Sequence, residues 1–211
     1  MDISEARREY TESSLRLEDL KPDPFDQFGL WLQQATTAGI LEANAMSLAT
    51  VSADGQPTQR TVLLKYLDSD GLVFFTNLES VKARHIARNN NVSLLFLWSE
   101  LGRQVVIAGT AAKVSHGESL RYFLTRPRGS QIGAWVSEQS QVISSRTLLE
   151  QKFDEMKRKF ADGKVPLPSF WGGYRVRPIS LEFWQGAPNR LHDRFLYSRK
   201  VDAWKIERLA P

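Results

Sequence analysis

Three side chains near the middle of the chain are spaced so that they could clamp a phosphate group. The segment 118–126 has helical spacing, which places Tyr122 and Arg126 one turn apart on the same face. Ser130 follows shortly after Pro127, where this helix must stop. A phenol, a guanidinium and a hydroxyl that converge can bind a phosphate through charge-assisted hydrogen bonds. Taken alone, the same pattern is more simply an ordinary polar helix face.

The segment RLHDRF, residues 190–195, carries the richest set of groups for ligand binding or proton transfer. On a strand, Arg190, His192 and Arg194 would lie on one face and Asp193 on the other. If the cationic face points inward, it needs an anionic or electron-rich ligand, because buried charges must be paired. If it points outward, it is a solvated face with surface ion pairs. The pattern alone leaves both interpretations open.

Two more polar clusters lie around the first hairpins. Arg60 and Lys65 flank an apolar strand. Thr76, Ser80 and Lys82 lie where a strand leads into a helix, whose free N-terminal amides attract anions, although plain capping also explains Ser80. Cation groups in separate places predict two phosphorylated ligands, such as a cofactor and a substrate. No Ser-His-Asp order or carboxylate pair stands out, so we expect a bound cofactor to supply the reactivity.

The composition excludes several classes of protein. The chain has 211 residues, of which 42% are hydrophobic and 25% charged, so it can bury a sizeable core and is neither disordered nor a coiled coil. It has no cysteine, which excludes disulfides, thiolate zinc sites, iron–sulfur clusters and a cysteine nucleophile. The three histidines, His85, His116 and His192, are far apart in sequence. We therefore expect no metal site.

Charge and hydropathy predict a soluble cytoplasmic protein. The formal net charge of +4 is too small to indicate nucleic-acid binding. No uncharged apolar stretch reaches the length of a bilayer span, and the N-terminus is charged from its second residue, unlike a secretory signal. We expect no nucleic-acid or membrane partner. Residues 1–20 are polar and weakly periodic, which predicts a mobile or docking arm, followed by a single domain over residues 21–211.

Strand patterns joined by short turns outnumber helical patterns along the chain. The fold class predicted is mainly β (α+β), with an antiparallel sheet that closes or nearly closes into a barrel and helices packed outside it. The sequence has no GxGxxG or GxxxxGK[ST] loop, and its order is not βαβ. We expect helices at about 24–38, 80–89, 118–126 and 147–160, and strands at about 45–52, 58–67, 71–76, 92–98, 103–114, 174–186, 190–199 and 202–209.

Several long motifs together resemble those of the pyridoxine/pyridoxamine 5′-phosphate oxidase family. The resemblance runs from about residue 7 to the C-terminal ERLAP. The motifs are RREY at 7–10, QRTVLLK at 59–65, RPRGSQIGAWVSEQS at 126–140, VPLPSFWGGYRV at 165–176, EFWQG at 182–186 and RLHDRF at 190–195.

The resemblance implies a homodimer with a split β-barrel fold that binds FMN at the subunit interface. It implies oxidation of pyridoxamine 5′-phosphate or pyridoxine 5′-phosphate to pyridoxal 5′-phosphate. Hydride then passes from the C4′ carbon to flavin N5, O2 reoxidises the flavin to give H2O2, and the amine substrate also releases ammonia.

The resemblance also assigns roles to residues of this sequence. Arg190 and His192 match catalytic residues beside the substrate ring. The matches to cofactor-binding residues are Arg60, Thr61, Val62, Leu63, Leu64, Lys65, Phe75, Thr76, Lys82, Gln104, Gln139, Ser140, Trp184 and Arg194. The matches to substrate-binding residues are Arg7, Arg8, Glu9, Tyr10, Lys65, Tyr122, Arg126, Ser130, Arg190, Leu191 and His192, the first four in an N-terminal segment that can cover the substrate.

Two positions depart from the family pattern, and both predict weaker FMN binding. Phe75 stands where the family usually has tyrosine, and Val81 where it usually has arginine. A lost charge-assisted hydrogen bond costs roughly 1.5–3 kcal/mol when nothing compensates.

Two other functions compete with this interpretation. One is a flavin reductase, or a dehydrogenase with another substrate, on the same kind of barrel. The phosphate clamp of Tyr122, Arg126 and Ser130 argues against it, and so do Arg190 and His192. The other is a non-enzymatic module that binds nucleic acid or a phosphorylated ligand. Against it, aromatic residues do not alternate with the cations as they do in stacking platforms.

Overall fold

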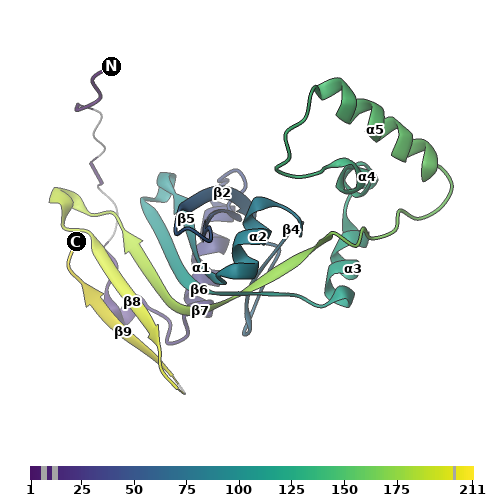
Figure 1. Ribbon diagram of the computed structural model, residues 1–211. Coiled ribbons are helices and arrows are strands. Elements are labelled where there is room, and N and C mark those ends of the chain that lie inside the picture. The colour runs from purple at the N-terminus through teal and green to yellow at the C-terminus, as the bar shows by residue number, and fades with distance from the viewer. Residues whose placement is uncertain (6–8, 11–13, 202) are drawn as a thin grey trace.

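The computed structural model describes residues 1–5, 9–10, 14–201 and 203–211. Within these residues one antiparallel sheet of nine strands runs in the order β2-β1-β5-β6-β7-β4-β3, with β8 paired to β7 and β9 to β8. The strands are β1 Ala45–Val51, β2 Pro57–Leu63, β3 Tyr66–Asp68, β4 Gly71–Asn77, β5 Asn91–Trp98, β6 Arg103–Lys113, β7 Trp171–Gln185, β8 Asp193–Arg199 and β9 Trp204–Leu209. The sheet curls into a split barrel, as predicted (Figure 1).

Helices flank the curled sheet. They are α1 Pro24–Thr37, α2 Val81–Arg88, α3 His116–Thr125, α4 Arg128–Val136 and α5 Arg146–Lys159, with short 3₁₀ turns η1 Leu17–Asp19, η2 Ser99–Leu101 and η3 Pro188–Arg190. Figure 1 shows α3, α4 and α5 at one side of the sheet and the hairpin of β8 and β9 at the other. This separation decides which candidate residues can meet within one chain.

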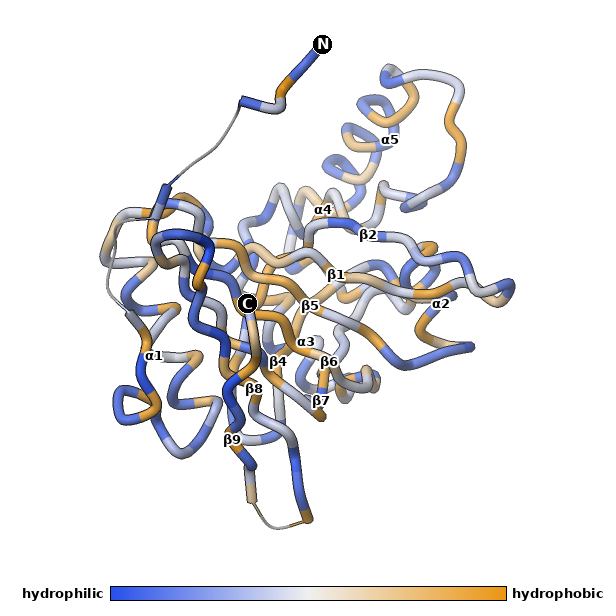
Figure 2. Tube along the Cα trace, turned by 90° about the vertical axis from the view of Figure 1, so that its left-hand side faces the viewer, coloured by the Kyte–Doolittle hydropathy of each residue, from blue (hydrophilic) through white to orange (hydrophobic). Residues whose placement is uncertain are grey.

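The main core fills the barrel beneath α1. The carboxylate of Asp23 accepts a hydrogen bond from the Phe25 amide over 2.7 Å, which caps α1 as the sequence predicts. The helix buries Phe28 and Trp31, which are 0% and 2% exposed. Phe28 packs against Phe96 with ring centroids 4.8 Å apart. Figure 2 shows the same core as hydrophobic colour along β4, β5 and β6.

A second, smaller apolar cluster holds α3 and α4 against the beginning of β7. Phe123 of α3 is fully buried, and its ring lies 5.3 Å from that of Trp171 on β7. Ile132 of α4 and Val165 complete the cluster at 3% and 1% exposed. Full burial of each large apolar side chain contributes about 1.5–3 kcal/mol, so this cluster fixes the position of both helices.

Three local predictions are wrong. The strand expected at 58–67 is two strands, because the chain turns at residues 64–65, where the Lys65 amide donates to the Val73 carbonyl. The sequence prediction lacks helix α4: Pro127 ends α3, as expected, but it also stands just before the first helical residue of α4. The strand expected from residue 190 begins at Asp193. Before it, Asn189 and Arg190 have φ of 55° and 64°, which no strand allows.

Candidate active site

A cavity of about 530 Å³ opens between the sheet and helices α3 and α4. It collects most of the residues that the sequence assigns to cofactor and substrate phosphate binding. Of those, the cavity is lined by Thr61, Val62, Leu63, Lys65, Phe75, Thr76, Lys82, Tyr122, Arg126, Ser130 and Gln139. The sequence did not single out the other lining residues, which are Asn77, Gly133, Ala134, Ser137 and Trp171. Each of these residues is next to a predicted residue in the sequence or lies within one of the motifs given above. That position was the sequence signal that could have identified them.

A buried ammonium group marks one end of the cavity. Lys82 is 8% exposed, and its Nζ donates to Oε1 of Gln139 over 2.8 Å and to Oγ1 of Thr76 over 3.1 Å. Burial, with the nearby charge of Arg60, lowers the pKa of Lys82 to about 8. Its hydrogen-bond partners are neutral oxygens, including Oγ of Ser80 at 3.4 Å. An ammonium held this way favours an anionic ligand.

Arg60 lies near Lys82 but outside the lining of the cavity. Its guanidinium donates to Oγ1 of Thr50 over 2.7 Å and to the Leu48 carbonyl over 3.1 Å. It therefore faces the strand β1 and does not line the cavity. Leu64, also predicted to contact the cofactor, is buried in the main core instead. Ser140 lies near the N-terminus of α2, where its Oγ accepts from the Val81 amide over 3.4 Å.

A second cation lies at the α3 side of the cavity. The guanidinium of Arg126 lies 4.8 Å from the centre of the Trp171 ring, and its Nη1 is buried with no hydrogen-bond partner among the described residues. Burial lowers the pKa of Arg126 and raises that of Tyr122. Tyr122, Ser130 and Lys65 line the same cavity. A buried N–H group left unbonded is costly, so this corner is built to accept an anion.

Three aromatic rings in the lining of the cavity, those of Phe75, Tyr122 and Trp171, stack on one another. The ring of Phe75 stacks on Tyr122 with centroids 4.2 Å apart and planes 18° apart. It also lies 5.5 Å from Trp171 with planes only 6° apart. These rings give the cavity an apolar aromatic lining, and Phe75 stacks on both neighbours without a hydroxyl.

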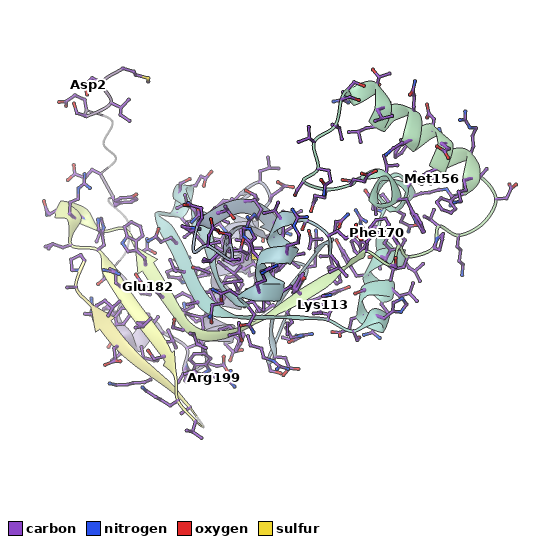
Figure 3. All side chains as sticks on the ribbon, in the orientation of Figure 1. Asp2, Lys113, Met156, Phe170, Glu182 and Arg199 are labelled. Atoms are coloured by element: carbon purple, nitrogen blue, oxygen red, sulfur yellow. The ribbon has the colours of Figure 1, made fainter. Side chains whose placement is uncertain are left out.

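The remaining predicted residues gather on the other side of the molecule. The His192 ring lies 4.6 Å from Trp184, and the Tyr10 ring contacts both edge-on at 5.6 Å and 5.5 Å. Gln104 is the register partner of Trp184 across β6 and β7. Figure 3 shows this side at Glu182, whereas Phe170 lies far from it beside α3 and α4. The structure therefore brings the candidate residues together as two sets that do not meet within one chain.

The predicted common strand face of Arg190, His192 and Arg194 is wrong. Arg190 and Leu191 are exposed in and after the turn η3, and only Arg194 lies on β8. Its Nε pairs with Oε1 of Glu182 over 2.8 Å, so this guanidinium is held in place. Nδ1 of His192 accepts from the Ala187 amide over 3.1 Å, which leaves Nε2 to carry the proton of the neutral ring.

The N-terminal candidates are only partly described. Arg7 and Arg8 lie outside the described residues. Glu9 is exposed, and Tyr10 is half-buried against Trp184 and His192.

Comparison with known proteins decides the family. A family model described as pyridoxamine 5′-phosphate oxidase matches residues 32–160, and one described as the pyridoxine 5′-phosphate oxidase C-terminal dimerisation region matches residues 171–211. The chain belongs to the pyridoxine/pyridoxamine 5′-phosphate oxidase family. A relative of that name from Rippkaea orientalis is 62% identical over the whole of both chains, and one from Vibrio cholerae is 57% identical, again over the whole of both.

Solved structures agree with this membership. The oxidase-family chain matches PhzG from Burkholderia lata, solved with tetrahydrophenazine-1-carboxylic acid, with a TM-score of 0.87 and 29% identity over 92% of this chain and 95% of that one. An FMN-binding protein from Nostoc punctiforme shares the fold, with a TM-score of 0.72 at 16% identity over 91% of this chain and 100% of that one. In the part of the oxidase-family chain that the structure describes, no helix is long and apolar enough to span a bilayer.

Proposed function

We propose that this chain oxidises pyridoxamine 5′-phosphate or pyridoxine 5′-phosphate to pyridoxal 5′-phosphate, with FMN as its cofactor and O2 as the electron acceptor. One observation carries the proposal: a single cavity is lined by two cationic groups with different partners, Lys82 and Arg126, and by a cluster of aromatic rings. A phosphorylated flavin and a phosphorylated pyridine are both planar and both carry a phosphate. When bound, FMN supplies the hydride acceptor, and its reoxidation by O2 yields H2O2, with ammonia also released from the amine substrate.

The Lys82 end fits the phosphate of FMN. The buried ammonium has hydroxyl and amide oxygens as partners and lies near Arg60, so a dianion there is stabilised by both cations. Thr76 and Gln139 already contact Nζ of Lys82 and would lie beside the bound phosphate. Phe75 and residues 61–63 line the same cavity and would hold the rest of the cofactor.

The Arg126 corner fits the phosphate of the substrate. Nη1 of Arg126 has no hydrogen-bond partner in the described part of the chain, and a phosphate oxygen would satisfy it. Tyr122 and Ser130 contribute hydroxyls, and Lys65 contributes a second cation from the opposite wall. These groups hold the substrate by a part remote from its reacting carbon, so they position it without taking part in the chemistry.

The second set of residues serves the cavity of a partner subunit. Residues 171–211 match the dimerisation region of the family, and they carry Trp184, Arg190, His192 and Arg194. A two-fold dimer places this face of one subunit over the cavity of the other, so each site draws on both chains. There, Arg190 orients the substrate ring and stabilises negative charge on it, and Nε2 of His192 donates a hydrogen bond or relays a proton.

The remaining assignments belong to the same proposal. Residues 1–20 form an arm over the site, with Arg7, Arg8, Glu9 and Tyr10 toward the substrate, and residues 21–211 form the FMN-binding domain. Gln104 contacts the flavin beside Trp184, and Leu191 lies beside the substrate. A cytoplasmic location stays a prediction.

Product analysis tests the proposed function. FMN-loaded protein is mixed with pyridoxine 5′-phosphate in air, and pyridoxal 5′-phosphate and H2O2 are quantified together. We expect the two in equal amounts, and with the amine substrate an equal amount of ammonia. Nicotinamide nucleotides in place of the substrate are the control, since a flavin reductase would consume them. Protein that oxidises those nucleotides but leaves both phosphorylated pyridines unchanged would refute the proposal.

A further inference from the structure

The ring of Tyr10 occupies a slot whose floor is made by two glycines. A Cβ atom added to Gly186 would lie 2.4 Å from Cδ1 of Tyr10, and one added to Gly102 would lie 2.9 Å from the same atom. The two glycines are joined, because the Gly186 amide donates to the Gly102 carbonyl over 2.7 Å. Trp184 and His192 form the walls through edge-on contacts. The ring therefore fits only because both floor residues lack side chains.

A buried carboxylate fixes the chain a few residues further on. Asp193 is 9% exposed, and its Oδ2 accepts from the Leu15 amide over 2.9 Å. Its Oδ1 forms an ion pair with Arg208 of β9, and Nη2 of Arg208 donates to the Leu15 carbonyl over 3.4 Å. The Arg208 guanidinium also lies 4.4 Å from the centre of the Phe195 ring. Removing one partner from such a pair leaves a buried charge unpaired, so the anchor holds only as a unit.

The Tyr10 slot and the Asp193 anchor both lie next to His192. Asp193 directly follows His192, and Tyr10 packs on the His192 ring. Tyr10 lies five positions before Leu15, with four residues between them, so a fixed Leu15 keeps Tyr10 within about 17 Å of its anchor. That tether raises the effective concentration of the Tyr10 ring at its slot.

We propose that Gly186 and Asp193 are positioning residues that dock the N-terminal arm: Gly186 admits the Tyr10 ring and Asp193 anchors Leu15. The docked ring holds the His192 imidazole from its edge, while the Ala187 amide holds Nδ1. The inference rests on the proposed function only in that His192 acts on the substrate.

The test is a double-mutant cycle on the FMN-loaded enzyme. Gly186→Ala drives a methyl group into the Tyr10 ring, and its backbone allows alanine because its φ lies outside the left-handed region. We expect kcat/KM for pyridoxine 5′-phosphate to fall about 5- to 100-fold, the size of two lost aromatic contacts. In a Tyr10→Ala background the ring atoms nearest to the added methyl group are absent, so we expect the same change to lower kcat/KM less than twofold. Gly29→Ala is the matched control, since its Cβ meets only Leu67 at 3.9 Å.

Hydrogen exchange tests docking without any activity. We expect exchange of the Leu15 amide to speed up at least tenfold in Asp193→Ala, and exchange in the peptide that carries Tyr10 to speed up in Gly186→Ala. Glu207→Ala on the same hairpin is the control and leaves both peptides unchanged. Melting temperature and flavin-to-protein ratio identify a variant that has simply unfolded.

The outcomes separate the two proposals. The docking inference would be overturned if Gly186→Ala lowered kcat/KM equally in the wild-type and Tyr10→Ala backgrounds. It would also be overturned if hydrogen exchange were unchanged in both Gly186→Ala and Asp193→Ala. Faster exchange in both variants of a protein that never oxidises the substrate would support docking while refuting the proposed function.

Discussion

The ammonium of Lys82 lies 2.8 Å from Oε1 of Gln139 and so joins helix α2 to the segment after α4. Among the residues that the structure describes, its hydrogen-bond partners are the oxygens of Thr76, Ser80 and Gln139, and none of these is a carboxylate. Burial and the nearby Arg60 therefore lower its pKa to about 8. This corner holds positive charge at neutral pH at an energetic cost that an anionic ligand relieves.

FMN binding should weaken as pH rises above about 8. Below that pH Lys82 is already charged, and above it the ligand must also drive protonation, so affinity falls by up to tenfold per pH unit. Fluorescence titration of apo-protein with FMN between about pH 7 and 10 measures this, since the phosphate itself is a dianion there. Lys82→Met should bind more weakly and lose the dependence. The same pH dependence in that variant would show that another group titrates.

The depressed pKa also predicts the stability of the apo-protein. The unfolded lysine titrates near 10.5, so charged Lys82 destabilises the fold below about pH 8. This destabilisation disappears as pH rises from about 8 to 10.5, so the Lys82 contribution makes apo-protein more stable over that window. Thermal melts of wild type and Lys82→Met should therefore converge toward high pH, and a constant difference would contradict this origin.

Restoring an arginine at position 81 should tighten FMN binding. Val81 is the first residue of α2, beside Lys82, and its amide already contacts Ser140. One added charge-assisted contact to the phosphate corresponds to about 10- to 150-fold in affinity. Val81→Met is the control, because it adds length without charge. Equal FMN affinity of Val81→Arg and wild type would place the phosphate elsewhere.

Arg126→Ala should raise KM for pyridoxine 5′-phosphate strongly and change kcat little. The residue binds a phosphate remote from the reacting carbon, so its contact is similar in the ground and transition states. The expected loss in kcat/KM is about 10- to 150-fold. FMN content should stay normal. Arg121→Ala is the control, because Arg121 is an exposed arginine on α3, the helix that ends just before Arg126. Loss of FMN instead would mean that the two phosphate corners are assigned the wrong way round.

Mixed dimers test whether each site draws on two chains. Arg126→Ala subunits and Arg190→Met subunits are each impaired as homodimers. A purified mixed dimer has one site with both changes and one site with neither, so it should recover about half of the wild-type kcat/KM. Activity that equals the mean of the two homodimers would instead show that both residues serve the same site from one chain.

Much of the fold was readable from the sequence because local signals agree with the packing. The Asp23 cap and the Phe28 and Trp31 face define α1, and alternating apolar residues define β1 and β5. Helix α4 was missed because its first turn has no side-chain cap, and its hydrophobic face is buried by Phe123 and Trp171 from distant parts of the chain.

The sequence identified individual residues of the candidate site but did not predict how they are arranged in space. Motifs identified Lys82, Arg126 and His192, whose spacing says nothing about which side of the barrel each occupies. The strand expected at Arg190 fails because Pro188 starts a turn and Arg190 adopts a left-handed φ. Only the three-dimensional pairing of β7 with both β4 and β8 shows that two sets of site residues lie at opposite ends of one strand.

Anaerobic reduction of the bound flavin tests the central claim most directly. FMN-loaded protein is mixed with pyridoxine 5′-phosphate without O2, and the flavin absorbance band is followed in a stopped-flow instrument. We predict complete bleaching with one pyridoxal 5′-phosphate formed per flavin, and return of the band when O2 is admitted. A flavin band that stays unchanged with saturating pyridoxine 5′-phosphate and with saturating pyridoxamine 5′-phosphate would contradict the account.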